Sequence, residues 1–257
     1  MLQQERLHRI QALLTQFQRL STERIMTELN ISRETARRDM IELDALGVAQ
    51  RVHGGIVLHQ QIPSEAPLNV RYHQYSKEKR AIARAAVRQL TSGQTLFIDA
   101  GSTTSILAEE LRSLSGLTII TNSLQVALNL SSVSETDSAQ HEIILLGGRI
   151  QQRPQTQGDY VISEIQRYQA DIALLSAVGV AADHGASSFY SEEACIAAAM
   201  VKHSQRLILM ADHSKLDVIS RVRYAEQHEI SMLITDKYAQ NKVDLARYQL
   251  NLEVVVA

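Results

Sequence analysis

The first sixty residues carry apolar side chains at helical spacing. These side chains recur every three or four positions in three segments: Leu7, Ile10, Leu13, Leu14 and Phe17; Ile25, Met26 and Leu29; Ala36, Met40, Leu43 and Leu46. The spacing predicts three short helices. Ser21 and Ser32 precede the second and third helices and can cap them, and Gly47 follows the third, where a left-handed residue often ends a helix. Asn30 and Ile31 leave room only for a tight corner between helices.

The pattern changes after residue 47 to two short extended runs. Residues 48–52 and 56–58 flank His53-Gly54-Gly55, which predicts a pair of strands joined by a glycine turn. Pro63 and Pro67 then bracket a polar stretch without periodicity, which is typical of an interdomain linker. We therefore expect a small domain at 1–58, a linker at 59–75 and a larger domain at 76–257.

Short, continuously apolar runs alternate with helical segments in the larger domain. The six runs are residues 95–98, 117–120, 143–146, 172–175, 207–210 and 232–234. Continuous apolarity indicates strands that are buried on both faces, as in a parallel sheet covered by helices. The expected fold class is α/β, with a small N-terminal winged helix-turn-helix domain ahead of a larger parallel α/β domain.

Composition limits the possible compartments and partners. Cys195 is the only cysteine, so an internal disulfide framework is excluded and a reducing compartment is favoured. Neither the polar N-terminal segment nor any later stretch has the apolar length needed to span a bilayer, and we expect a cytoplasmic protein with no membrane partner. The formal charge of −2 is not that of a strongly basic nucleic-acid binder, so DNA binding must depend on local charge.

The third predicted helix has a partly basic face. Glu34, Thr35, Arg37 and Arg38 lie away from the stripe formed by Ala36, Met40 and Leu43. An α-helix fits the major groove, where arginine binds guanine and threonine contacts phosphate or a thymine methyl. Ser32 and Arg33 stand at the start of this helix, where free N–H groups attract a backbone phosphate.

The predicted hairpin adds a second set of groups that suit DNA. Arg51 and His53 stand beside Gly54 and Gly55, whose backbone can approach a duplex closely, as a wing does. Solvated arginines on an ordinary three-helix domain are the alternative. The helix spacing, the tight corner and the basic glycine hairpin together favour DNA binding.

Polar and glycine motifs directly follow five of the apolar runs. They are Asp99 to Thr104, Thr121 to Ser123, Gly147 to Arg149, Val178-Gly179 and Asp212 to Lys215. The carboxyl ends of parallel strands share one edge of a sheet, where ligands of α/β folds bind, so we expect the motifs to converge on one pocket. Gly101-Ser102-Thr103-Thr104 opens a helical segment and suits a phosphate, although these residues also form an ordinary capped turn. Lys215 can add a positive charge, and Asp99 can accept hydrogen bonds from sugar hydroxyls.

The run from Ser32 to Met40, followed by Leu43, Gly47, Arg51 and His53-Gly54-Gly55, resembles the helix-turn-helix signature of the DeoR-type family of bacterial sugar-metabolism repressors. The resemblance covers Gln4 to about Asp236. It implies that Arg37 and Arg38 lie at the DNA surface, that Asp39 orients an arginine, and that the His-Gly-Gly segment belongs to the wing.

The resemblance also implies that the larger domain is similar to a ribose-5-phosphate isomerase fold that senses phosphorylated sugars. The residues that match the family pattern in this domain are Asp99, Gly101, Ser102, Thr103, Thr104, Asn122, Gly147, Gly148, Gly179 and Lys215. Ser176-Ala177 departs from that pattern, in which Ile-Gly is common, and the departure changes one wall of the expected pocket.

The expected protein is therefore a repressor that binds double-stranded operator DNA as a homo-oligomer, a dimer or a tetramer, and that responds to a phosphorylated sugar without a metal or other cofactor. A sugar-phosphate isomerase-like enzyme is the alternative, with Lys215 as the cation and Asp183, Glu192 or Glu193 as the base. A third hypothesis is that the protein is a DNA-binding scaffold that has no ligand. Cys195 lies in an apolar helical stretch, where a packed structural thiol is expected rather than a nucleophile.

Overall fold

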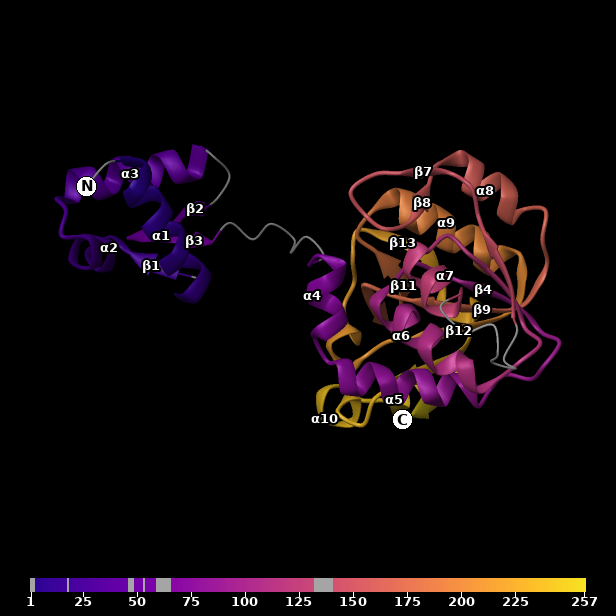
Figure 1. Ribbon diagram of the computed structural model, residues 1–257. Helices are drawn as coiled ribbons and strands as arrows, with labels where there is room; N and C mark the ends of the chain where they lie inside the picture. Colours follow the sequence, from indigo (N-terminus) through magenta and orange to yellow (C-terminus); the bar gives the residue numbers. More distant parts are fainter. Residues whose placement is uncertain (1–2, 18, 46–48, 53, 59–65, 132–140) are drawn as a thin grey trace. The chain divides into compact units, whose positions relative to one another are not determined.

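The computed structural model of the protein describes residues 3–17, 19–45, 49–52, 54–58, 66–131 and 141–257 (Figure 1). The chain divides into two compact units, Met1–Ser64 and Glu65–Ala257. Among the described residues, no helix combines the length and the apolarity that crossing a bilayer requires.

The first unit contains three helices and a small antiparallel sheet. Its elements are α1 (Gln3–Phe17), β1 (Arg19–Ser21), α2 (Thr22–Leu29), α3 (Arg33–Ala45), β2 (Ala49–Val52) and β3 (Gly55–Leu58). The strand order is β1-β3-β2. The three predicted helices and the predicted hairpin are confirmed. Strand β1 was not predicted, because only one apolar residue, Leu20, marks this three-residue segment.

The local signals at the helix ends act as the sequence predicts. The Ser21 hydroxyl accepts a hydrogen bond from the Arg24 N–H at 3.2 Å, and Asn30 ends α2 in the left-handed conformation. The Ser32 hydroxyl accepts from the Thr35 N–H, also at 3.2 Å. Since each bond satisfies a free N–H in the first helical turn, the two serines fix where α2 and α3 begin. Gly47 lies outside the described residues.

The second unit is a larger α/β assembly. Its helices are α4 (Leu68–His73), α5 (Ser76–Val87), α6 (Ser102–Glu110), α7 (Leu124–Ser131), α8 (Asp159–Ile165), α9 (Ser191–Lys202), α10 (Ala239–Lys242) and α11 (Ala246–Gln249), with 3₁₀ helices η1 (Leu111–Ser113), η2 (His213–Lys215) and η3 (Gln227–Glu229). Its strands are β4 (Thr95–Ile98), β5 (Thr118–Thr121), β6 (Glu142–Leu145), β7 (Arg149–Ile150), β8 (Thr156–Gln157), β9 (Ala170–Ser176), β10 (Gly179–Ala181), β11 (Gly185–Ser188), β12 (Ser204–Met210), β13 (Val222–Ala225), β14 (Ile230–Thr235) and β15 (Glu253–Val256).

A parallel seven-stranded sheet organises this unit, in the order β15-β14-β12-β9-β4-β5-β6. All six predicted runs are strands of this sheet, and only β15 was not predicted. Successive side chains of β4 belong to two separate cores. Phe97 packs with residues of α8 and α9, whereas Leu96 and Ile98 pack with residues of α5, α6 and α7. This burial on both faces explains why the runs are continuously apolar.

Two smaller features were not predicted. One is an antiparallel sheet of β10, β11 and β13. Its strands β10 and β11 are short and rich in glycine, alanine and serine, and they lack the alternating apolar pattern of a half-buried strand. Helix α4 occupies residues 68–73, inside the range 59–75 that the composition indicates as linker. It begins directly after Pro67, a residue suited to the start of a helix.

Candidate DNA-binding surface and ligand pocket

Two predicted DNA-reading arginines lie on the exposed face of α3. Arg37 and Arg38 are exposed, whereas Ala36, Met40 and Leu43 are buried in the core of the first unit. The Arg38 side chain is 76% exposed and its Nε lies 3.7 Å from Glu34 Oε1. Such a pair at the surface is weak, so the Arg38 guanidinium can leave Glu34 for a nucleic-acid partner.

At the start of α3, Ser32 and Arg33 are exposed and Thr35 is half-buried. The hydroxyl oxygens of Ser32 and Thr35 lie 2.8 Å apart, and Arg33 Nη2 lies 2.8 Å from Glu23 Oε1 on α2. The Arg33–Glu23 pair therefore ties the two helices of the motif together across their corner. A phosphate at this helix start would compete with Glu23 for the Arg33 guanidinium.

The hairpin β2–β3, which we call the wing, presents Arg51 and Gly54 to solvent. Gly54 has a φ of +83°, which favours glycine at the turn. Gly55, which the sequence proposes as a DNA contact, is buried, and a Cβ atom there would lie 2.1 Å from the Leu20 carbonyl oxygen. The close pairing of β3 with β1 explains this glycine. His53 lies outside the described residues.

Asp39 forms the ion pair that the family resemblance implies, and its partner is Arg6 of α1. Arg6 Nε lies 2.6 Å from Asp39 Oδ2, and Arg6 Nη2 lies 3.0 Å from Oδ1. The Asp39 side chain is 1% exposed. Because the two parallel bonds join α1 and α3 through residues that are 33 positions apart in the chain, they fix the orientation of α3 on α1.

Replacing Arg6 with methionine should destabilise the first unit strongly. The variant leaves the Asp39 carboxylate buried without its counter-charge, which is the costly way to break a buried ion pair. Thermal unfolding followed by circular dichroism should show an earlier transition, and amides of α3 should exchange faster. Arg9→Met is the matched control, since Arg9 pairs with Glu5 at 3.8 Å in a largely exposed site on the same helix. Equal melting of the two variants would contradict a structural role for the Arg6–Asp39 pair.

Two adjoining hollows open at the carboxyl edge of the parallel sheet. The first, which we call the polar pocket, has about 460 Å³ of space and is lined by Asp99, Ala100, Asn122, Gln155, Val178, Ser188, Glu193, Ile196, Ala197 and Tyr224. The second, which we call the cationic pocket, has about 390 Å³ and is lined by Gln74, Tyr75, Lys79, Ser102, Thr103, Met210, Ala211, Asp212, Ser214 and Lys215. Arg71, Ser176 and Ala177 line both.

The cationic pocket surrounds the first turn of α6 with positive charge. Ser102 and Thr103, which begin that helix, lie on its wall together with Lys79 and Lys215. Lys79 Nζ donates to the carbonyl oxygens of Arg71 and Gln74 at 2.5 and 2.8 Å. Within the described residues, the Lys215 ammonium forms no hydrogen bond or ion pair. Free N–H groups of a helix start together with ammonium groups favour an anion.

Two polar side chains near the cationic pocket, Thr104 of α6 and Asp212 before η2, are engaged in local structure instead. The Thr104 hydroxyl accepts from the Gly101 N–H at 2.8 Å and is fully buried, so it caps α6 and does not line either pocket. The Asp212 carboxylate accepts from the N–H and the hydroxyl of Ser214 at 2.9 and 2.5 Å. It therefore caps η2, which carries Lys215.

The polar pocket contains an acceptor that lacks a donor. Asn122 is 3% exposed, and its Nδ2 donates to the Thr156 carbonyl at 3.1 Å, which fixes the orientation of the amide. Its Oδ1 is buried and has no hydrogen-bond partner among the residues that the structure describes. A buried acceptor without a donor costs about 1–3 kcal/mol, so a ligand that donates a hydrogen bond here would gain affinity.

Glu193 is a second acceptor in the polar pocket. Its Oε1 accepts from Arg153 Nη1 at 2.5 Å and from Gln155 Nε2 at 3.0 Å. The isomerase alternative names this carboxylate as one possible base. Arg153 and Gln155 hold this carboxyl group by donating hydrogen bonds to it, and it does not share a pocket with Lys215.

Asp99 forms the junction between the end of β4 and the end of β9. Its Oδ2 accepts from the Ser176 N–H at 3.0 Å and from the Ser176 hydroxyl at 3.1 Å. Desolvation nevertheless raises the pKa of Asp99 to about 7, and the nearby Glu193 carboxylate adds to the rise. Ser176, the residue that departs from the family pattern, thus holds this carboxylate at the wall between the two pockets.

The raised pKa of Asp99 predicts a pH-dependent stability. Because the folded-state pKa exceeds the unfolded value, the carboxyl does not destabilise the fold below about pH 4, and its destabilising effect grows up to about pH 7. The stability of Asp99→Asn relative to wild type should therefore increase by roughly 1–3 kcal/mol when the pH is raised from 5 to 8. Melting temperatures at the two pH values measure this gain. A difference between variant and wild type that does not change with pH would contradict the assignment.

Four predicted glycines line neither pocket. A Cβ atom on Gly101 would lie 2.1 Å from Ser176 Oγ. The Gly147 N–H donates to Glu164 Oε2 at 2.5 Å. A Cβ atom on Gly148 would lie 2.7 Å from Val161 Cγ2, and one on Gly179 would lie 2.3 Å from the Val218 carbonyl oxygen. Close packing within the chain explains the last two glycines. Of the five strand-end motifs, the one at 147–149 contributes no residue to either pocket.

Several pocket residues were not predicted from the sequence. Arg71 lies in the range assigned to the linker, Lys79 lies on α5, and Gln155, Ser188 and Tyr224 come from segments outside the parallel sheet. None of these side chains follows a strand of that sheet, so the strand-end rule cannot find them. Cys195, expected to be packed, is exposed.

A helix-turn-helix unit with an exposed arginine face, followed by an α/β unit with a pocket at its strand ends, defines the class of ligand-responsive transcription regulators. Residues 6–61 match the DeoR-like helix-turn-helix domain, and residues 74–237 match the DeoR C terminal sensor domain. The chain belongs to the DeoR family of helix-turn-helix transcriptional regulators. This membership places it among DNA-binding regulators and not in an enzyme family.

Similar proteins extend over nearly the whole chain. The chain is 36% identical over 241 residues to the HTH-type transcriptional repressor GlcR of Bacillus subtilis, covering 92% of this chain and 90% of that protein. It is 32% identical over 221 residues to the glycerol-3-phosphate regulon repressor of Escherichia coli, with 84% of each covered. Among solved structures, ribose 5 phosphate isomerase A from Neisseria gonorrhoeae matches with a TM-score of 0.40 and 16% identity, covering 56% of this chain and 54% of that one.

Proposed function

We propose that the protein is a cytoplasmic repressor of a carbohydrate-metabolism operon and that a phosphorylated sugar, bound at the two adjoining pockets, controls its binding to operator DNA. The observation that carries this proposal is the pairing of a cationic pocket with an acceptor-rich pocket across Ser176 and Ala177. The two pockets match the two chemically different ends of one sugar phosphate. Relatives named for the repression of a glycerol-3-phosphate regulon support the proposal.

The phosphate group of the effector binds in the cationic pocket. Lys215 donates to it directly, and Ser102 and Thr103 offer hydroxyls and free N–H groups at the start of α6. Arg71 reaches the same phosphate from α4. A phosphate dianion binds more tightly to such a set than a neutral group does, because each contact is a charge-assisted hydrogen bond.

The hydroxyl-bearing part of the effector binds in the polar pocket. Asn122 Oδ1 accepts a hydrogen bond from one sugar hydroxyl, which removes the cost of its unpaired burial. Asp99 accepts a second hydrogen bond from the sugar. Since a site that is built to receive hydrogen bonds rejects analogues that lack the donor, these acceptors select a hydroxylated ligand.

Operator DNA binds to the first unit. Helix α3 enters the major groove with Arg37, Arg38 and Thr35, while Ser32 and Arg33 contact a backbone phosphate, and the wing adds Arg51, His53 and the exposed tip at Gly54. A homo-oligomer, a dimer or a tetramer, places two such units on half-sites about 34 Å apart, one turn of DNA.

Helix α4 connects the pockets to the chain that leads to the first unit. Arg71 Nε donates to the Ala66 carbonyl oxygen at 2.8 Å, and Arg71 also lines both pockets. A bound phosphate therefore competes with the chain at Ala66 for the Arg71 guanidinium. The segment 59–75 acts as the linker through which this competition changes how the DNA-binding units are presented.

Calorimetric titration tests the proposed ligand class. Glucose 6-phosphate, fructose 6-phosphate and glycerol 3-phosphate are the probes, with glucose, glycerol and inorganic phosphate as controls for each half of the ligand. We expect at least one sugar phosphate to bind more tightly than either of its halves, without turnover. Turnover would favour the isomerase-like enzyme, and the absence of binding to every probe would favour a scaffold without a ligand.

A further inference from the structure

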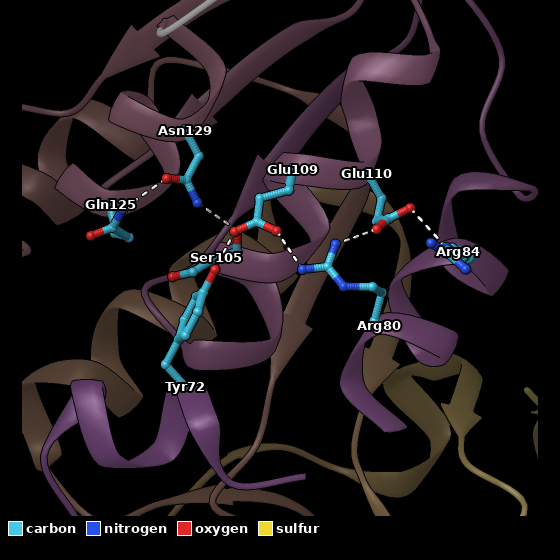
Figure 2. Close-up of polar contacts among 8 residues, drawn as sticks. All are labelled: Tyr72, Arg80, Arg84, Ser105, Glu109, Glu110, Gln125 and Asn129. Atoms are coloured by element: carbon cyan, nitrogen blue, oxygen red, sulfur yellow. Dashed lines mark hydrogen bonds and ion pairs between the residues drawn. The ribbon is translucent and has the colours of Figure 1, made fainter. Parts of the chain in front are cut away.

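A network of hydrogen bonds and ion pairs joins α4 and α5 to the far end of α6 (Figure 2). The Tyr72 hydroxyl donates to Glu109 Oε1. Arg80 bridges the two acidic residues, with Nη2 at 2.6 Å from Glu109 Oε2 and Nη1 at 2.5 Å from Glu110 Oε1. Arg84 Nε lies 2.9 Å from Glu110 Oε2. Of these side chains, only Tyr72 belongs to α4.

Helix α6 is also fixed on its other side, by α7. Asn129 Nδ2 donates to the Ser105 carbonyl oxygen at 2.9 Å, and Gln125 Nε2 donates to Asn129 Oδ1 at 2.7 Å (Figure 2). The first turn of α6 forms a wall of the cationic pocket. Helix α6 is therefore a fixed support that carries the pocket at one end and Glu109 at the other.

Helix α4, in contrast, is short. It has six residues and no fully buried side chain, so its length does not stabilise it, and the Tyr72 ring is only partly buried where it packs against the apolar core of this unit. The Lys79 ammonium donates hydrogen bonds to the carbonyl oxygens of Arg71 and Gln74 at the C-terminal end of α4. The Tyr72–Glu109 hydrogen bond is the contact that a side chain of α4 makes with α6 in this network. Burial and the Glu109 carboxylate raise the pKa of Tyr72 to about 12, so the hydroxyl keeps its proton at neutral pH.

We propose that Tyr72 is a positioning residue for effector recognition: its hydrogen bond to Glu109 holds α4 on α6 so that the neighbouring Arg71 reaches the two pockets. The inference rests on the proposed function for the identity of the ligand. Arg71 lines the pockets and also donates to the Ala66 carbonyl oxygen. The Tyr72–Glu109 hydrogen bond therefore also controls whether ligand binding in the pockets changes the chain that leads to the DNA-binding unit.

A double-mutant cycle separates positioning from general stability. Tyr72→Phe removes one hydrogen bond to a charged group, and should weaken glucose 6-phosphate binding by about three- to tenfold in calorimetry. Arg71→Met should weaken it at least as much. If Tyr72 acts through Arg71, then the double variant loses no more affinity than Arg71→Met alone. Losses that multiply, or wild-type affinity in Tyr72→Phe, would overturn the proposal.

Three further variants test the specific bond. Glu109→Gln keeps an acceptor for the Tyr72 hydroxyl and should retain binding, whereas Glu109→Leu should behave as Tyr72→Phe does. Arg84→Ala is the matched control, since it breaks an exposed ion pair of the same network without touching α4. We expect wild-type binding in this control. Equal loss in all three variants would show that the network acts only through general stability.

Hydrogen exchange of the ligand-free protein keeps this inference separate from the proposed function. Tyr72→Phe should accelerate exchange of the amides at 68–75 several-fold and leave the amides of α6 unchanged, because Arg80, Arg84 and Asn129 still hold that helix. If wild type binds no sugar phosphate but α4 exchanges faster in the variant, then the proposed function fails while the anchoring of α4 by Tyr72 holds. Unchanged exchange of α4 would overturn the inference whatever the ligand.

Discussion

Replacing Arg38 with alanine will remove most of the affinity for operator DNA while leaving ligand binding intact. The Arg38 guanidinium is 76% exposed, and in the described part of the chain its one ion pair is the weak surface pair with Glu34. A bidentate contact of arginine with guanine is worth about 1–3 kcal/mol, so two protomers on two half-sites lose about thirtyfold to about twenty-thousandfold in affinity. Fluorescence anisotropy with a duplex selected from a random pool by the wild-type protein measures the loss.

The Arg38 variant has a matched control in the second unit. Arg206→Ala removes the same charge from an exposed position at the amino-terminal half of β12, away from the strand-end pockets, and should leave DNA affinity unchanged. Thermal stabilisation by glucose 6-phosphate should be equal in both variants and in wild type. Loss of both DNA binding and ligand stabilisation in Arg38→Ala would contradict the separation of the two sites into two units.

Replacing Lys215 with methionine will abolish most of the response to phosphorylated sugars and spare DNA affinity. Methionine keeps the apolar volume of the side chain but removes the ammonium that lies in the cationic pocket without a protein partner in the described part of the chain. A hydrogen bond to a charged group is worth about 1.5–3 kcal/mol, which corresponds to about a ten- to hundredfold loss in affinity. Calorimetry with glucose 6-phosphate measures it.

Lys202→Met controls for the loss of a lysine. Lys202 is an exposed residue in the last turn of α9 and lines neither pocket, so this variant should bind ligand as wild type does. If Lys215→Met responds to sugar phosphates as wild type does, then the phosphate group does not bind at the start of α6.

The pattern of apolar strands and the motifs at the strand ends predict much of the fold and some of the residues that line the pockets. Continuous apolar runs predict strands buried on both faces, and the structure places six of them in one parallel sheet. The strand-end rule also predicts one shared pocket; in the structure, Asp99, Ser102, Thr103 and Lys215 line two adjoining pockets at one edge of the sheet. Local periodicity and chain direction are sufficient for both results.

The remaining features depend on contacts that no local pattern records. Arg71 reaches the pockets from α4, a helix that follows a polar stretch and has no strand beside it in sequence. Arg6 and Asp39 meet across 33 residues. Gly55 and Gly179 resemble ligand-contacting glycines in sequence, but close approach of another backbone segment explains both. Sequence cannot distinguish these two reasons for a glycine, since each requires only the absence of a Cβ atom.

The most direct measurement is the affinity of the full-length protein for its selected duplex, with and without each sugar phosphate at saturation. Control by a phosphorylated sugar predicts that at least one of them changes the dissociation constant, and that the duplex changes the affinity for that sugar phosphate by the same factor, as linkage requires. An identical dissociation constant with every sugar phosphate that binds would contradict effector control, because a ligand with equal affinity for the free and DNA-bound protein shifts nothing.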